Sequence, residues 1–281
     1  EDVPEQVYYG DSFTVSANGA DGTVQYAVTT GSSIATVDPT TGEVSVNGAG
    51  RVTLTATSVK EGYTTRTATR SFEARKRVLT LTAQAEDKIY DGEAGVAVRL
   101  TPGNLVNGDT ITATARGTMS NADVGTEKIV TVSNITLSGD NKDCYTADTA
   151  GLQTTVTVSP KEITGFTVQA ESKKYDKTAA AQASVTGMTG VLDADLGQVG
   201  IAGRAAFDSA DSGAYKTVTF TATGLTGAKS GNYRLTAQTA EAKADISPLQ
   251  VQFTLGQTTF VYDGTEKQLS VSATDELGRV F

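Results

Sequence analysis

The sequence lacks the side chains on which most enzymes and metal sites depend. Its 281 residues include no histidine, no tryptophan and a single cysteine, Cys144. The absence of histidine excludes a Ser-His-Asp triad, a Cys-His dyad, histidine-ligated zinc or haem, and a histidine pH switch. A single cysteine excludes an intramolecular disulfide and a multi-cysteine metal cluster. We therefore expect no catalytic, cofactor-binding or metal-binding residues, no cofactor, and an inert thiol at Cys144.

Proline is also scarce, whereas threonine and glycine are plentiful. The chain has 5 Pro, 29 Gly and 46 Thr. Threonine is β-branched and favours strands, and glycine favours turns. The composition therefore predicts an all-β fold of short strands joined by tight turns. It excludes a helical bundle, a coiled coil and a collagen-like repeat.

The charge balance is acidic, with 23 Lys and Arg against 32 Asp and Glu and a net charge of −9. An acidic surface repels phosphate backbones, so we expect no nucleic-acid partner. No apolar run approaches the ~18 residues of a spanning helix, so we expect no membrane insertion. The near-absence of cysteine favours an exported protein. The first residues carry no signal peptide and the last lie in a strand pattern, which favours a segment of a longer protein.

A sequence repeat divides the chain into units. Three tyrosines that each precede an aspartate are spaced by 85 and then 87 residues: Tyr90, Tyr175 and Tyr262. Self-similarity at a fixed period is typical of tandem structural units, and a period of this length suits one small β-sandwich per repeat. We predict domains at 1–77, 78–162 and 163–250, followed by the truncated start of a third repeat at 251–281.

Apolar and polar residues alternate within the repeats. Thr217–Thr223 places three apolar side chains on one face and four threonines on the other, and Thr154–Val158 and Ile129–Val132 show the same pattern. A period of two with one apolar face is typical of a half-buried antiparallel strand. Turn signals such as Asn107–Asp109 separate these runs. The expected fold is an elongated array of tandem immunoglobulin-like β-sandwich domains.

The N-terminal stretch has a different pattern. Ser33–Asp38 leads through a predicted hairpin turn at Thr40–Gly42 to Glu43–Val46, and a threonine-rich strand follows at Arg51–Thr57. This stretch, roughly Val7 to Ala74, resembles the group 2 bacterial immunoglobulin-like domain, which carries a similar hairpin and a T-x-T-A-T strand. The resemblance implies an immunoglobulin-like sandwich at the N-terminal end.

The Tyr-Asp segments resemble the YDG domain, which is close to the MBG domains of bacterial surface proteins. The matching features are Lys88–Gly92, Ala122–Gly125 and Ser230–Tyr233, and the second copy departs at Lys177, where glycine is expected. The resemblance covers Val78 to Leu249 as two copies. It implies a row of β-sandwich modules in a large secreted or wall-attached bacterial protein, often an adhesin, and hence an extracellular or cell-surface location.

The recurring Tyr-Asp pairs have two interpretations. They could form a ligand site, or they could be structural, with the aspartate bonding to turn N–H groups and the tyrosine burying its ring with its hydroxyl bonded at the rim. Because every copy needs the same turn, recurrence favours the structural interpretation.

Three further groups of residues are weaker candidates for chemistry. The acidic groups considered for calcium are Asp140 with Asp143 and Asp148, Asp193 with Asp195, and Asp208 with Asp211. None matches the D-x-D-x-D-G pattern. Lys128 and Lys216 occupy equivalent strand positions suited to an isopeptide cross-link, although lysines there usually extend into water. Gly197–Gly203 has the wrong spacing for a phosphate loop and predicts a mobile loop.

We interpret the chain as a non-catalytic stalk of a large secreted or cell-surface adhesin-like protein that projects a distal functional domain. It is expected to be a monomer whose partners are the adjacent domains of the parent chain. Junctions that contain Pro160 and Pro248 limit the swing of the modules. Two alternatives stay open: one module binds a host glycan or matrix protein, or the chain is an accessory region of a secreted carbohydrate-active enzyme. The tail 251–281 has too few strands for a sandwich, and we expect it to be disordered or added to a neighbouring molecule.

Overall fold

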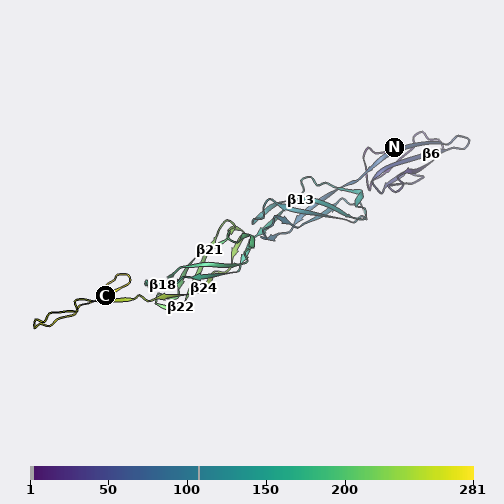
Figure 1. Ribbon diagram of the computed structural model, residues 1–281. Helices are drawn as coiled ribbons and strands as arrows, with labels where there is room; N and C mark the ends of the chain where they lie inside the picture. Colours follow the sequence, from purple (N-terminus) through teal and green to yellow (C-terminus); the bar gives the residue numbers. More distant parts are fainter. Residues whose placement is uncertain (1–2, 107) are drawn as a thin grey trace. The chain divides into compact units, whose positions relative to one another are not determined.

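The described part of the chain is almost entirely β-structure. A computed structural model of the chain describes residues 3–106 and 108–281. Asn107, in one of the predicted turns, lies outside the described residues. The helical segments of the described residues are three single turns of 3-10 helix: Lys142–Cys144, Asp193–Asp195 and Ser230–Asn232. The predicted all-β fold is therefore confirmed (Figure 1).

The chain separates into two compact units. The first comprises Glu1–Lys88 and Glu93–Val158, and the second comprises Ile89–Gly92 and Ser159–Phe281. The four residues Ile89–Gly92 thus belong to the second unit by their contacts, although the residues on either side belong to the first. The domain boundaries predicted at residues 77, 162 and 250 stay predictions.

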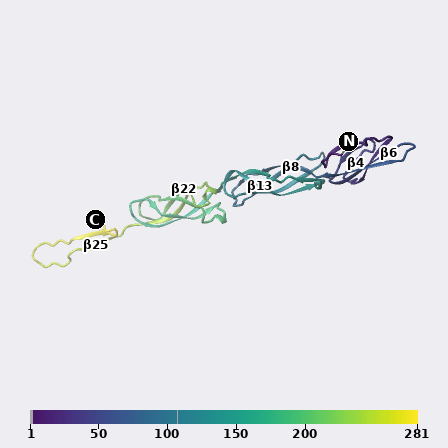
Figure 2. The same ribbon diagram turned by 90° about the horizontal axis from the view of Figure 1, so that it is seen from above.

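Strands β1 to β7 form an N-terminal module of two sheets in the first unit. The larger sheet has the order β1 (Val7–Tyr8), β7 (Arg66–Arg75), β6 (Gly50–Val59) and β3 (Thr23–Thr30). The smaller sheet has the order β2 (Ser12–Thr14), β5 (Glu43–Val46) and β4 (Ala35–Val37). β4 and β6, one strand from each sheet, are labelled near the N-terminus in Figure 2.

The core of this module lies between its two sheets. Ala35 and Val44 from the smaller sheet pack with Val52 and Leu54 from the larger one. The predicted hairpin is confirmed, since β4 pairs antiparallel with β5 and Gly42 turns the chain with a φ of +74°. A left-handed φ favours glycine because it has no Cβ to clash.

Strands β8 to β15 form a middle module. A three-stranded sheet has the order β11 (Val98–Gly103), β8 (Arg77–Ala85) and β14 (Tyr145–Ala147). A five-stranded sheet has the order β10 (Gly95–Val96), β12 (Ile111–Met119), β13 (Gly125–Gly139), β15 (Gln153–Ser159) and β9 (Lys88–Ile89). The predicted alternation is confirmed by buried Val130 and Val132 on β13 and Val156 and Val158 on β15.

The second unit repeats this arrangement. Its five-stranded sheet has the order β18 (Lys173–Lys174), β24 (Thr239–Ser247), β22 (Gly213–Thr226), β21 (Gly200–Phe207) and β19 (Ala180–Ala181). Two pairs accompany it: β17 (Gly165–Ala170) with β20 (Ala183–Thr189), and β16 (Lys161–Ile163) with β23 (Tyr233–Leu235). Val218, Phe220 and Ala222 are buried, as the alternation of β22 predicts.

The mobile loop predicted at Gly197–Gly203 is wrong in its second half. Residues from Gly200 onward form β21. Gly203 lies at a register shift between β21 and β22, where an added Cβ would approach ring atoms of Phe220 to 2.3 Å. The glycine therefore serves close packing within a strand and not mobility.

The C-terminal segment forms a hairpin. β25 (Val251–Leu255) pairs antiparallel with β26 (Val271–Asp275), and β25 is labelled on the yellow part of Figure 2. All five side chains of β25 are exposed. The segment therefore pairs within its own chain, which differs from the disordered or added strand that we expected.

Candidate functional site

Two tyrosines share one carboxylate in the first unit. The Tyr9 hydroxyl donates to Oδ1 and Oδ2 of Asp109 at 3.1 and 2.9 Å, and the Tyr145 hydroxyl donates to Oδ2 of the same residue. The two rings meet edge to face, with centroids 5.3 Å apart and planes at 85°. Both rings are buried. We call Tyr9, Asp109 and Tyr145 the first tyrosine cluster.

Backbone contacts hold Tyr9 in place directly after β1. Its N–H donates to the carbonyl of Arg75 at 2.9 Å. Its carbonyl accepts from Nε of Arg77 at 2.7 Å, and Nη2 of the same guanidinium pairs with Oδ1 of Asp11 at 2.7 Å. The junction between β7 and β8 therefore fixes the tyrosine from both sides.

Gly10 allows Tyr9 to reach the cluster. Gly10 has a φ of +85°, and a Cβ there would come within 2.3 Å of Cγ2 of Val106. The N–H of Val106 donates to the Tyr145 hydroxyl at 2.9 Å. The loop that follows Tyr9 is thus in close contact with the loop that contains Val106 and the acceptor Asp109.

The second unit contains the same arrangement. The hydroxyls of Tyr90 and Tyr233 donate to Oδ2 of Asp195 at 2.9 and 2.6 Å. Their ring centroids are 5.6 Å apart and their planes lie at 78°. The N–H of Leu192 donates to the Tyr233 hydroxyl at 3.1 Å. Tyr90, Asp195 and Tyr233 are each 5% exposed or less, and we call them the second tyrosine cluster.

Each cluster receives its first tyrosine in the same way. The N–H of Tyr90 donates to the carbonyl of Ser159 at 2.8 Å, as that of Tyr9 does to Arg75. The N–H of Tyr175 makes the equivalent bond to Ser247 at 2.9 Å. Three times in the chain, therefore, a short edge strand is followed by a tyrosine whose N–H bonds to the end of the last strand of the same sheet.

Burial and the shared carboxylate act together on the tyrosine hydroxyls of the second cluster. Burial, followed by the hydrogen bond to Asp195, raises the pKa of Tyr233 to about 12. The same two causes raise the pKa of Tyr90. Both hydroxyls therefore stay protonated and act as donors at any pH at which a free tyrosine would.

The first cluster follows the same electrostatic pattern. Burial and then the hydrogen bond to Asp109 raise the pKa values of Tyr9 and Tyr145. Burial alone would raise the pKa of Asp109, but hydrogen bonds from Tyr145, Asn141 and Tyr9 outweigh it and hold that pKa below its ordinary value. An ionised carboxylate between neutral donors makes the stronger, charge-assisted kind of hydrogen bond.

The chain is similar to one protein family over more than half of its length. The model of the YDG domain matches residues 75–154 and 159–240. The chain belongs to the YDG domain family. Each YDG repeat contains one shared aspartate and one second tyrosine, namely Asp109 with Tyr145 in the first repeat and Asp195 with Tyr233 in the second.

Solved structures with some similarity to the chain include sets of cadherin domains and part of a surface layer protein. Extracellular cadherin domains 3–6 of protocadherin gamma B2 share 11% identity, with 97% of this chain and 80% of that chain covered and a TM-score of 0.24. Drosophila N-cadherin EC1–3 shares 10% identity, with 88% and 99% covered and a TM-score of 0.24. Domains 4–9 of the surface layer protein SbsC share 13% identity, with 96% and 48% covered and a TM-score of 0.18. No curated protein matches the chain.

Tyr-Asp pairs of the YDG repeats make contacts that the structural interpretation predicts. Oδ1 of Asp176 accepts from the Thr178 N–H at 2.9 Å, which is the predicted turn bond. The Tyr90 ring is buried with its hydroxyl bonded, also as predicted. Tyr262 differs, since it is 94% exposed in the C-terminal hairpin.

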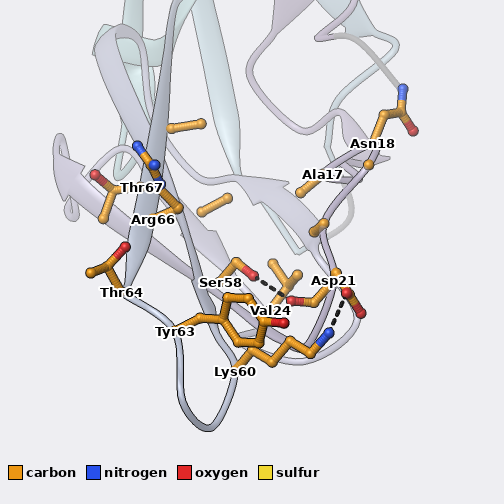
Figure 3. A pocket seen from close by; sticks show the side chains of 14 residues that line it. Ala17, Asn18, Asp21, Val24, Ser58, Lys60, Tyr63, Thr64, Arg66 and Thr67 are labelled. Carbon is orange, nitrogen blue, oxygen red and sulfur yellow. Dashed lines mark hydrogen bonds and ion pairs between the residues drawn. The ribbon is translucent and has the colours of Figure 1, made fainter.

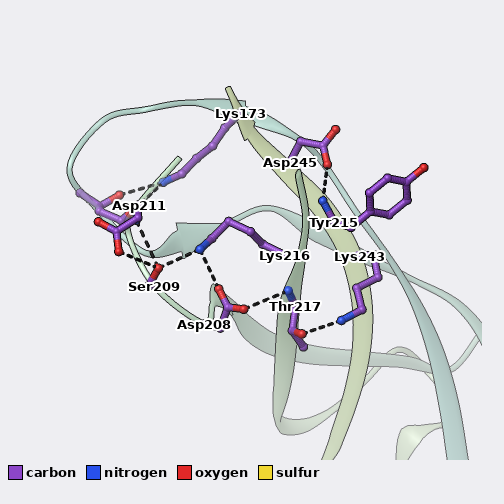
Figure 4. A network of polar contacts seen from close by, with 10 residues as sticks. Lys173, Asp208, Ser209, Asp211, Tyr215, Lys216, Thr217, Lys243 and Asp245 are labelled. Atoms are coloured by element: carbon purple, nitrogen blue, oxygen red, sulfur yellow. Dashed lines mark hydrogen bonds and ion pairs between the residues drawn. The ribbon is translucent and has the colours of Figure 1, made fainter. Parts of the chain in front are cut away.

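The acidic residues considered for calcium have other partners. Asp195 belongs to the second tyrosine cluster, whereas Asp193 is exposed. Asp208 and Asp211 come together around Ser209, but Nζ of Lys216 pairs with Oδ1 of Asp208 at 2.9 Å (Figure 4). In residues 3–106 and 108–281 no group of three or more His, Cys, Asp or Glu is placed to hold a metal ion, and this includes Asp140, Asp143 and Asp148.

The two lysines at equivalent positions follow matching β-bulges. Lys128 and Lys216 each follow a residue with left-handed φ, +50° at Glu127 and +53° at Tyr215. Nζ of Lys128 donates to Oδ1 of Asn121 at 2.8 Å. The Lys216 side chain is only 12% exposed, so the expectation that it extends into water is wrong, because the bulge turns it toward Asp208.

Sequence reasoning missed half of the tyrosine clusters. It treated Asp195 as a calcium candidate and singled out neither Tyr9 nor Asp109. Asp109 and Asp195 occupy equivalent positions in the two YDG repeats, whereas Tyr9 is followed by Gly10 and Asp11, the reverse of the Asp-Gly order that follows Tyr90. The predicted inert Cys144 is a partly buried free thiol packed against the core that contains the first cluster.

Proposed function

We propose that the chain is a non-catalytic spacer in a secreted or cell-surface bacterial protein of the adhesin type, where it holds a distal functional domain away from the surface. In this proposal the N-terminal module is an immunoglobulin-like domain of the bacterial group 2 type that precedes the YDG repeats. The observation that carries the proposal is the buried tyrosine cluster, which occurs in the same form in both units.

The first cluster supports a stiff connection between modules. Tyr9 belongs to the N-terminal module, whereas Asp109 and Tyr145 belong to the first YDG repeat. Bending at this junction would expose two buried rings and break hydrogen bonds to a carboxylate. Each such bond contributes roughly 1.5–3 kcal/mol, so large bending is strongly disfavoured.

The outer faces of the sheets support a solvated role. The hydroxyl oxygens of Thr29 and Thr55 lie 3.1 Å apart. On the same sheet, the hydroxyl oxygens of Thr53 and Ser71 lie 2.9 Å apart. Rows of hydroxyls satisfy one another and water and leave little apolar surface. In the described residues no helix is long and apolar enough to cross a membrane.

The distribution of distances between two spin labels tests the proposal. Labels are placed on exposed Thr69→Cys and Thr131→Cys in a Cys144→Ser background of the full chain. A stiff spacer gives a narrow distribution, which Asp109→Asn broadens. Asp140→Asn, an exposed acid in the same repeat, is the matched control and leaves it narrow. An equally broad distribution in the parent protein contradicts the spacer function.

A further inference from the structure

The larger sheet of the N-terminal module extends beyond the smaller one. Its long strands β3, β6 and β7 have eight to ten residues, whereas β2, β5 and β4 have three or four. On β7, Ala74 is buried and Phe72 is half-buried, but Arg66, Ala68 and Arg70 on the same face are exposed. One end of the inner face is therefore left uncovered.

The uncovered face forms the floor of a groove with a volume of about 470 Å³. Small side chains form part of its floor, where the register aligns Ala56 with Ala68. The wall opposite β7 is the segment Ala17–Asp21 (Figure 3). The volume falls in the range of pockets that hold small ligands.

The groove combines an exposed aromatic ring with polar groups. Tyr63 is 71% exposed at the mouth, and Nζ of Lys60 lies 4.8 Å from its ring centroid. Lys60 also pairs with Asp21, which neutralises its charge (Figure 3). Asn18, Thr64 and Thr67, which carry amide and hydroxyl groups, are among the other residues at the groove.

Arg66 gives the groove its net charge. Within the part of the chain that the structure describes, its guanidinium makes no hydrogen bond or ion pair, and Arg66 and Tyr63 both line the groove (Figure 3). An accessible guanidinium binds a carboxylate through two parallel hydrogen bonds. An acidic chain with a net charge of −9 thus presents a local cationic site in this groove.

We propose that this groove binds an acidic saccharide. A pyranose ring stacks on Tyr63, its carboxylate pairs with Arg66, and its hydroxyls bond to the amide and hydroxyl groups of the lining. The small side chains of Ala56 and Ala68 leave the depth that the ring needs. The inference does not depend on the spacer function, since it concerns one face of one module.

Binding of matched saccharides to the full chain tests the proposal. The probes are trigalacturonic acid and its methyl ester, which differ in charge, and 3′-sialyllactose as a second acid. Amide NMR signals of residues 17–21 and 56–68 report the site. We expect an affinity near the millimolar range for the acids and about tenfold weaker binding of the ester.

Two exposed substitutions locate the contacts. Arg66→Gln is expected to weaken the binding of the acids about tenfold and to leave the affinity for the ester unchanged. Tyr63→Ala is expected to weaken the binding of all three probes. Arg116→Gln and Tyr262→Ala, also exposed, are the matched controls. The proposal is overturned if neither acid shifts these signals, if the shifts map elsewhere, or if Arg66→Gln leaves the preference for acid over ester intact.

Discussion

The rings of Tyr90 and Tyr233 lie edge to face, 5.6 Å apart, and both hydroxyls donate to a single oxygen of Asp195. Such ring pairs are favourable beyond the area they bury, and a buried carboxylate requires donors. Each part of the cluster therefore stabilises the others. The first cluster has the same arrangement, although its Tyr9 comes from the N-terminal module, whose sequence pattern differs from that of the YDG repeats. The arrangement therefore does not depend on the type of module that supplies the tyrosine.

Loss of the Asp195 carboxylate should destabilise the second unit. Asp195→Asn keeps the size of the side chain but replaces a charged acceptor of two hydroxyls with an amide. We expect a loss of about 1–3 kcal/mol in the free energy of unfolding. Urea unfolding followed through the amide NMR signals of Val218 and Phe220 measures it. Asp193→Asn, an exposed residue of the same turn, should change stability by no more than about 0.5 kcal/mol. Equal effects of the two variants would show that the carboxylate contributes nothing.

Gly10→Ala should destabilise the first unit through a steric clash as well as backbone strain. The new Cβ would come within 2.3 Å of Cγ2 of Val106. Gly19→Ala is the matched control, since Gly19 also has a left-handed φ, +74°, with nothing within 4 Å. Both variants carry the strain of about 1 kcal/mol, and Gly10→Ala adds about 1–3 kcal/mol for the clash. Thermal unfolding measures the difference.

A double variant separates the clash from other effects of the substitution. Adding Val106→Ala to Gly10→Ala removes the obstructing methyl groups, so part of the stability should return relative to the sum of the single variants. Strict additivity of the two changes would mean that the glycine is not needed for close approach to Val106.

The strands could be predicted from the sequence because their signal is local. The alternation of Val218, Phe220 and Ala222 with threonine reports burial on β22 directly. The turn at Gly42 is equally local. Gly203 misled the prediction because a glycine in a strand and a glycine in a loop look alike until the Phe220 ring beside it is known.

The tyrosine clusters could not be predicted in full because their members are distant in sequence. Tyr9 is 100 residues from Asp109, and Tyr145 is 36 residues from it. Pairing an aspartate with two tyrosines requires knowledge of which loops meet. The repeat spacing identifies Asp109 and Asp195 as equivalent, but only burial and hydrogen bonding distinguish Asp195 from its exposed neighbour Asp193.

Removing the ammonium of Lys216 should raise the pKa of Asp208. The hydrogen bond from Lys216 is the main cause that lowers this pKa in the folded protein. Lys216→Met fills the same volume without charge, so the carboxyl should titrate near its ordinary value. Because Asp208 is half-exposed and its ion pair is screened by solvent, the accompanying loss of stability should be small. Carboxyl-carbon NMR titration gives the pKa. Lys243→Met, whose lysine bonds to Thr217 instead, should leave it unchanged.

Alkaline pH should weaken the second tyrosine cluster in a defined window. In the unfolded chain Tyr233 ionises near its ordinary pKa of 10.0, whereas in the folded protein its pKa is about 12. The raised pKa contributes stability that is fully present below about pH 10, because both states are then protonated, and that is lost as the pH rises toward about 12. Within this window the free energy of unfolding should fall by up to about 1.4 kcal/mol per pH unit for this group.

A comparison of slopes isolates Tyr233 from the lysines that titrate in the same range. Urea unfolding at about pH 9, 10 and 11 is measured for the parent chain and for Tyr233→Phe. The variant is less stable below about pH 10, because Asp195 loses a donor, but its stability should fall less steeply above that pH. Tyr63→Phe, at an exposed tyrosine outside the cluster, is the matched control. Parallel curves for Tyr233→Phe and the parent would mean that Asp195 does not hold the Tyr233 hydroxyl in its protonated form.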